Sequence, residues 1–165
     1  MQIVKSILKI LTGIESVLAC VAYSIVAFLL IGDVIGRELL SSPIHGAQKM
    51  AVYAAIVAGF IGLSLATADN MHLRPTFLDN VLPARFNASL GRLSDSFACL
   101  FFLGMAIVGL LFVRESMRFE DKAAVLYWVL WPIQMIIPYA FLSTALRHGL
   151  FAAYPDVKPS TSSRH

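Results

Sequence analysis

Four stretches of this chain contain no Asp, Glu, Lys or Arg, and they constrain its fold more than any other feature. They are Ser16–Gly32, Met50–Ala68, Ser96–Val113 and Ala123–Leu146, with lengths of 17, 19, 18 and 24 residues. All 13 basic and 10 acidic side chains lie between or outside them. A helix that crosses a bilayer needs about 20 mostly apolar residues, within a range of about 17–25. The charge pattern therefore predicts an all-α integral membrane protein with four transmembrane helices.

The overall composition excludes other classes of protein. The chain is 58% hydrophobic and 14% charged, whereas a soluble domain is typically about 45–50% apolar and about 25% charged. Disordered chains combine low hydrophobicity with high charge, which is the opposite pattern. A net charge of +3 is too small for a nucleic-acid binder. We therefore expect this chain to lie in a lipid bilayer and to bind no nucleic acid.

The pattern also predicts how the chain is organised. Residues 1–150 are expected to form one membrane domain, and residues 151–165 a polar, disordered tail. The predicted spans cover residues 12–36, 48–69, 93–114 and 123–147. Between the second and third spans, apolar residues such as Phe77, Val81 and Phe86 recur at nearly helical spacing. This spacing favours an amphipathic segment that lies in the membrane interface, although a solvated loop is the alternative.

The distribution of Lys and Arg predicts the orientation. With the N-terminus inside, the inner segments carry eight such residues, among them Lys5, Lys9 and Arg147, and the outer loops carry five. Cytoplasmic segments are enriched in Lys and Arg. We therefore expect both termini in the cytoplasm and the protein in the bacterial inner membrane.

Small residues repeat every four positions along the second predicted span, at Ala54, Ala58, Gly62 and Ala66. Such a series gives a helix a smooth face that another helix can approach closely. The sequence leaves open whether that partner belongs to this chain or to another protein. Replacing Gly62 with Leu is expected to weaken whichever contact this face makes.

The chain offers little for catalysis or for transport by itself. A small multidrug-type exporter acting alone needs a carboxylate near the membrane centre, and a haem subunit needs facing axial ligands. No charged side chain and no His lies in the four stretches, and Glu15 is expected to mark a helix end at the interface. We therefore expect no catalytic, cofactor-binding, metal-binding or substrate-binding residue, and no buried polar site. A stand-alone exporter and a membrane assembly or redox subunit are the alternatives.

Several local motifs then point to a family. The segment Met71–Asp79 contains His72, Arg74 and Asp79 and is followed by Leu82-Pro83. It is similar to the His-(Ile/Leu)-x-(Val)-Asp pattern and following Leu-Pro of the small membrane subunit (DctQ-like) of tripartite ATP-independent periplasmic (TRAP) transporters. Arg37 matches the arginine that usually ends the first span of that subunit, and Pro138 matches its proline-bearing last helix. The resemblance covers about residues 11–150. It departs from the family at Gly46–Lys49, where Trp and Glu are common.

The resemblance implies a function in a complex. A periplasmic binding protein would deliver an organic acid, and a large membrane subunit would move it with a sodium gradient. The small subunit would brace the large one and hold neither substrate nor sodium. On this hypothesis the partner-interface candidates are Arg37, Ala54, Ala58, Gly62, Ala66, His72, Arg74, Asp79, Arg114 and Arg118.

Overall fold

Helices make up most of the structure, a computed structural model that describes residues 2–68 and 87–155. They are α1 (Gln2–Leu40), α2 (Ala47–Ala68), α4 (Asn87–Arg118), α5 (Trp131–Gln134) and α6 (Ile136–Ala153). Within the described ranges the only β pairing is an isolated antiparallel bridge between Lys122 and Val129. The prediction of an all-α fold is therefore confirmed.

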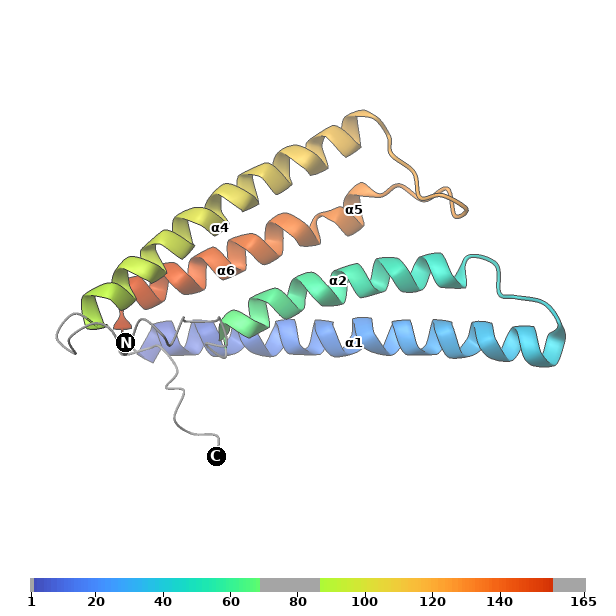
Figure 1. The fold of residues 1–165 in the computed structure, drawn as a ribbon, viewed down its shortest axis with the longest axis horizontal. Helices are drawn as coiled ribbons and strands as arrows, with labels where there is room; N and C mark the ends of the chain where they lie inside the picture. Colours follow the sequence, from blue (N-terminus) through green and yellow to red (C-terminus); the bar gives the residue numbers. More distant parts are fainter. Residues whose placement is uncertain (1, 69–86, 156–165) are drawn as a thin grey trace.

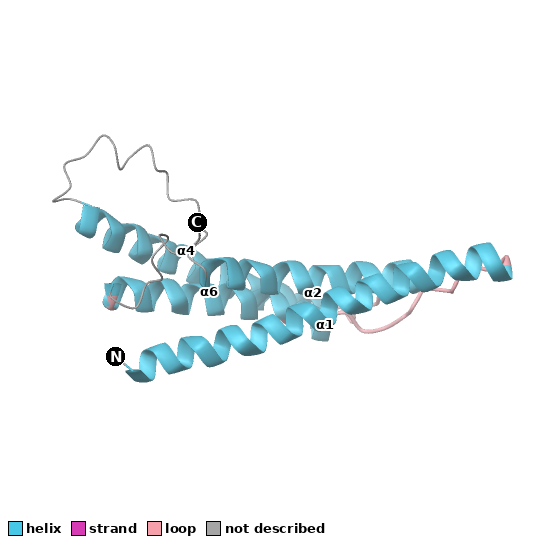
Figure 2. Ribbon diagram, turned by 90° about the horizontal axis from the view of Figure 1, so that it is seen from below, coloured by secondary structure: helices cyan, strands magenta, loops and turns pink. Residues whose placement is uncertain are grey.

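The helices form two long antiparallel hairpins that lie against each other (Figure 1). One hairpin consists of α1 and α2 and the other of α4 and α6, and α2 packs against α6 between them. The loops at 41–46 and 119–130 lie at one end of the molecule, and the N-terminus and the end of α6 lie at the other (Figure 1). Seen from the side, α1 runs along the whole length of the molecule and has a free outer face (Figure 2).

Three of the described helices, α1, α2 and α4, are long and apolar enough to cross a membrane. The helix α6 has 18 residues and carries Arg147 and His148 near its end, and it is not among the three. The count of four transmembrane helices therefore stays a prediction. Helix bounds also differ from the predicted spans, because α1 extends beyond residues 12–36 at both ends and α4 begins at Asn87.

The segment before α5 is not helical, although the apolar stretch that begins at Ala123 predicted a helix there. Val125 and Tyr127 have positive φ angles of 78° and 55°, which ends any helical path for residues with a side chain. The Ala123 N–H donates to the Trp128 carbonyl at 2.7 Å, and the Leu130 N–H donates to the Asp121 carbonyl at 3.0 Å. Apolar composition does not separate such a compact turn from a helix. The helix starts where Pro132 occupies its first turn, a position that suits proline.

Proline also explains the break between α5 and α6 at Met135. Pro138 has no N–H, so a continuous helix would lose a hydrogen bond, and its ring would collide with the carbonyl four residues earlier. The two helices are therefore separate, and α6 begins at Ile136. Pro138 also lies close to α4, because a Cβ added to Gly109 would lie 3.3 Å from the Pro138 nitrogen.

Two predicted segments fall partly or wholly outside the described residues. The amphipathic segment between the second and third spans lies mostly in residues 69–86, and the last part of the tail is residues 156–165. The first residues of the predicted tail continue α6 as far as Ala153, with Phe151 buried.

Candidate functional site

A buried ion pair joins the two hairpins. Glu15 of α1 is 0% exposed and Arg147 of α6 is 1% exposed. The Arg147 Nη2 donates to the Glu15 Oε2 at 2.5 Å, and the Arg147 Nη1 donates to the Thr12 hydroxyl at 2.9 Å. Removing two charges from water costs several kcal/mol per ion, and their attraction offsets this only when the remaining polar positions are also satisfied.

Hydroxyl groups from α2 and α6 satisfy the rest of the Glu15 carboxylate. The Ser143 hydroxyl donates to it at 2.6 Å and the Tyr139 hydroxyl at 3.3 Å. The Ser64 hydroxyl lies 2.9 Å from both carboxylate oxygens and 2.8 Å from the Ser143 hydroxyl. A carboxylate has about four acceptor positions, and Arg147 with these three hydroxyls supplies four donors. We call the four buried residues Glu15, Ser64, Ser143 and Arg147, together with the partly exposed Tyr139, the buried network.

The buried network corrects two expectations. Glu15 was expected at a helix end in the interface, and no buried polar site was expected, but the carboxylate lies in the protein interior. Arg147 was counted among the loop cations that set the orientation, yet its side chain is inside the bundle. One signal was visible in the sequence: Glu15 and Arg147 each directly border a charge-free stretch, and they carry opposite charges.

A second polar link joins α4 to α6 near the same end of the molecule. The Asp95 Oδ1 lies 3.2 Å from the His148 Nδ1, and both side chains are buried. The His148 ring also stacks on Phe102, with 5.8 Å between centroids and 6° between planes. Each hairpin therefore contributes a buried carboxylate that contacts a side chain of α6. Glu15 contacts the Arg147 guanidinium, and Asp95 contacts the His148 ring.

At the other end of the molecule, Asp33 fixes the turn between α1 and α2. Its carboxylate is 1% exposed and accepts hydrogen bonds from the Ile44 N–H at 3.2 Å and the Gln48 side chain at 3.1 Å. Arg37 pairs with it at 2.9 Å. The turn itself favours Gly46, whose φ of +79° is one that L side chains rarely adopt.

The structure scatters the predicted partner-interface residues. Arg37 is half-exposed and holds Asp33, while Arg114 and Arg118 are exposed at the end of α4. His72, Arg74 and Asp79 lie outside the described residues. None of the described candidates belongs to the buried network, whose members the sequence did not single out as site residues.

The small-residue face of α2 is only partly used within the chain. Ala58 is fully buried, whereas Ala54, Gly62 and Ala66 are partly exposed. A Cβ added to Gly62 would meet nothing within 4 Å. Close approach at Gly62 is therefore not made by a helix among the described residues, and a close contact at this position would have to be made by another partner.

An apolar stripe runs along the outer face of α1. Exposed aliphatic or aromatic residues recur with alternating spacings of three and four over its whole length, interrupted only at Ser24. They are Ile3, Ile7, Ile10, Ile14, Val17, Val21, Phe28, Ile31 and Ile35. This spacing is the one that packs two helices along a shared seam. We call these residues the α1 stripe.

The described residues show no metal-binding arrangement, since no three His, Cys, Asp or Glu side chains among them lie together. The buried network is electrically balanced and its carboxylate is saturated by the protein itself. Chemically, such a network can hold helices in a fixed arrangement. It leaves no acceptor on Glu15 for a transported ion.

A family model for the DctQ component of tripartite ATP-independent periplasmic transporters matches residues 25–154. The match covers most of the chain and includes α2, α4, α5 and α6. This chain belongs to the DctQ family. The family is a transporter component and not an enzyme, and it works with a large TRAP membrane subunit and a periplasmic binding protein. A comparison with curated proteins found no match.

Family membership confirms the resemblance drawn from the motifs, and it agrees with three helices apolar enough to cross a membrane. The chain is accordingly a membrane subunit of a TRAP transporter. Residues before position 25 lie outside the family match. Glu15 is among them, whereas its partners Ser64, Ser143 and Arg147 are within the match.

Proposed function

We propose that this DctQ chain braces the large TRAP subunit during sodium-coupled uptake of an organic acid that a periplasmic binding protein delivers. In this proposal the chain crosses the inner membrane four times, with α5 and α6 as the fourth crossing, and both termini are cytoplasmic. Substrate and sodium bind to the partners, and this chain holds neither.

The buried network is the observation that carries the proposal. Lipid tails are as apolar as Leu, so there is no hydrophobic force between helices inside a membrane, and packing with interhelical hydrogen bonds must hold them together. Glu15, Ser64 and Arg147 provide such bonds between three helices at a buried point. A subunit that keeps its own helices fixed can hold the static part of a transporter in place while another part moves.

The length of α1 supports a protein partner along the α1 stripe. At 1.5 Å per residue, its 39 residues span about 58 Å. A hydrocarbon core is about 30 Å thick, and a tilt of 40° lengthens the path to only about 40 Å. The stripe continues from Ile3 to Ile35, so lipid tails cannot cover all of it. A long helix of the large subunit is the partner that fits.

A substitution on this stripe tests the proposal. Ile31→Trp introduces a larger side chain on the stripe. Leu30→Trp introduces the same side chain at the preceding residue, which is exposed but does not belong to the stripe. Both variants would be produced with the large subunit and reconstituted in proteoliposomes with the binding protein. We expect Ile31→Trp to reduce co-purification and sodium-driven uptake severalfold, and Leu30→Trp to leave both nearly unchanged.

Three results would each count against one part of the proposal. Equal co-purification and uptake for both variants would show that the α1 stripe does not contact the large subunit. Uptake by the large subunit alone at the full rate would remove the bracing role. Sodium-independent uptake by the complete transporter would contradict only the coupling.

The binding protein is proposed to touch the loop end of the molecule near Arg114 and Arg118. Both side chains are exposed there, and Arg118 lies over Phe119 at 5.9 Å. Charge reversal in the Arg114→Glu/Arg118→Glu variant is expected to raise the concentration of loaded binding protein needed for half-maximal uptake, because complementary charges steer association. Unaltered uptake kinetics would exclude this contact.

A further inference from the structure

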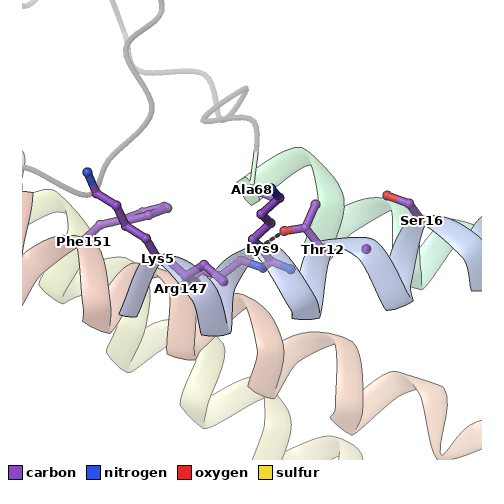
Figure 3. A pocket seen from close by; sticks show the side chains of 9 residues that line it. Lys5, Lys9, Thr12, Ser16, Ala68, Arg147 and Phe151 are labelled. Carbon is purple, nitrogen blue, oxygen red and sulfur yellow. Dashed lines mark hydrogen bonds between the residues drawn. The ribbon is translucent and has the colours of Figure 1, made fainter. Parts of the chain in front are cut away.

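An open cavity of about 430 Å³ lies between α1, the end of α2 and the end of α6. Polar residues of α1 form one wall, and they follow helical spacing at Lys5, Lys9, Thr12 and Ser16. Leu8, Ala68 and Phe151 supply apolar lining. Figure 3 shows the polar α1 side chains on the same side of that helix, with Arg147 reaching Thr12 from α6.

The two lysines give the cavity an uncompensated positive charge. Arg147 also lines it, but the Glu15 carboxylate neutralises that guanidinium. Lys5 and Lys9 are exposed, and no acidic side chain in residues 2–68 or 87–155 forms an ion pair with either of them. Like charges four residues apart on a helix repel each other. An anion held between the two ammonium groups would remove this repulsion.

Thr12 provides a hydroxyl donor at the inner end of the lysine pair. Its oxygen accepts the hydrogen bond from the Arg147 Nη1 at 2.9 Å, and a hydroxyl that accepts in this way keeps its own proton for donation. A phosphate oxygen is a suitable acceptor for one hydroxyl and two ammonium groups. The wall of α1 therefore has the donors that a phosphate group requires.

The surroundings distinguish a lipid phosphate from a dissolved one. The lysines lie about two and about three turns before the charge-free stretch that begins at Ser16. Lysines at such a place can reach the headgroups from the end of a membrane helix. The apolar lining at Leu8 and Phe151 gains from contact with glycerol and acyl carbons and would gain nothing from a free inorganic anion. We propose that this cavity binds the phosphodiester headgroup of an anionic phospholipid through Lys5, Lys9 and Thr12.

Lipid binding by variants of the full chain tests this site. Native mass spectrometry in a mild detergent would measure the affinity for the first added dioleoyl-phosphatidylglycerol molecule. We expect Lys5→Gln/Lys9→Gln to weaken it by about 30-fold, since each lysine near an anionic lipid surface contributes about one factor of five. The matched control is Lys49→Gln/Lys122→Gln, which removes two exposed lysines at the opposite end of the molecule. It is expected to bind normally, and Lys5→Arg/Lys9→Arg is expected to retain binding to within about threefold.

Four results would overturn the proposal. The first is equal binding by all four forms, and the second is an equal loss in the two glutamine variants, which would reflect overall charge alone. The third is displacement of the lipid by millimolar inorganic phosphate, and the fourth is equally tight binding of dioleoyl-phosphatidylcholine. A circular dichroism spectrum and thermal midpoint like those of the unaltered chain would show that Lys5→Gln/Lys9→Gln folds, and the arginine variant keeps the test valid if it does not.

Discussion

Arg147 and Glu15 are separated by 132 positions in the chain, yet the Arg147 guanidinium donates to the Glu15 carboxylate at 2.5 Å in the interior of the protein. The pair joins the first helix of one hairpin to the last helix of the other. Hydroxyls of Ser64, Ser143 and Tyr139 donate to the remaining acceptor positions of the carboxylate. This contact fixes the relative position of the two hairpins where lipid supplies no force to do so.

Loss of the guanidinium is expected to be costly. Arg147→Gln leaves the Glu15 charge buried without its counter-ion, and breaking a buried pair in this way costs about 3–5 kcal/mol. The midpoint of thermal unfolding in detergent should fall strongly. Arg114→Gln, which removes an exposed arginine of α4, should change it little. Equal effects of the two substitutions would contradict a structural role for the pair.

Removing both charges should cost less than removing one. In a Glu15→Met/Arg147→Met variant no charge stays buried, and apolar replacement of a buried ion pair is often neutral or stabilising. The Ser64 and Ser143 hydroxyls, 2.8 Å apart, can still bond to each other. A double-mutant cycle on the free energy of unfolding should give a coupling of about 2 kcal/mol or more. Additive single effects would show that the two groups act independently.

Asp33 is expected to hold the turn between α1 and α2. Asp33→Ala removes the acceptor for the Ile44 N–H and for Gln48, and a buried donor left without a partner costs about 1–3 kcal/mol. Limited proteolysis should then cut residues 41–46 faster. Glu38→Ala, an exposed acid five residues later, is the control, and cleavage as fast in this variant would exclude a specific role for Asp33.

A branched side chain at Gly109 is expected to strain the contact between α4 and α6. A Cβ there would lie 3.3 Å from the Pro138 nitrogen and 3.4 Å from its Cα, whereas a Cβ at Gly104 would meet nothing within 4 Å. Gly109→Val should therefore push α4 away from α6 and lower stability by about 1–3 kcal/mol. Gly104→Val is on the same helix and should have a much smaller effect. The thermal midpoints of the two variants provide the comparison.

A substitution at Gly62 distinguishes contacts within the chain from contacts with a partner. Because a Cβ there meets nothing within 4 Å, Gly62→Leu should leave the thermal midpoint of the isolated chain nearly unchanged. If the small-residue face of α2 meets the large subunit, the same variant should lose co-purification with it. Unchanged co-purification and uptake would remove Gly62 from the interface.

The sequence by itself determined the membrane class, the approximate place of α1, α2 and α4, and the family. These properties depend on the composition of continuous segments and on local motifs, which can be read without knowing what lies nearby in space. The same reasoning placed a helix at Ala123, because an apolar segment with aromatic residues fits either a helix or a compact turn. Only the backbone path through Val125 and Tyr127 decided between them.

Only the tertiary structure decided which charges are loop charges and which are buried. Glu15 and Arg147 stand at the borders of apolar stretches, where a charge can reach either the headgroups or a partner inside the bundle. That choice depends on whether an opposite charge and enough hydroxyls converge from helices distant in sequence. Ser64 and Ser143 meet that need here. Helix packing brought the four residues together, and no local pattern in the chain encodes that packing.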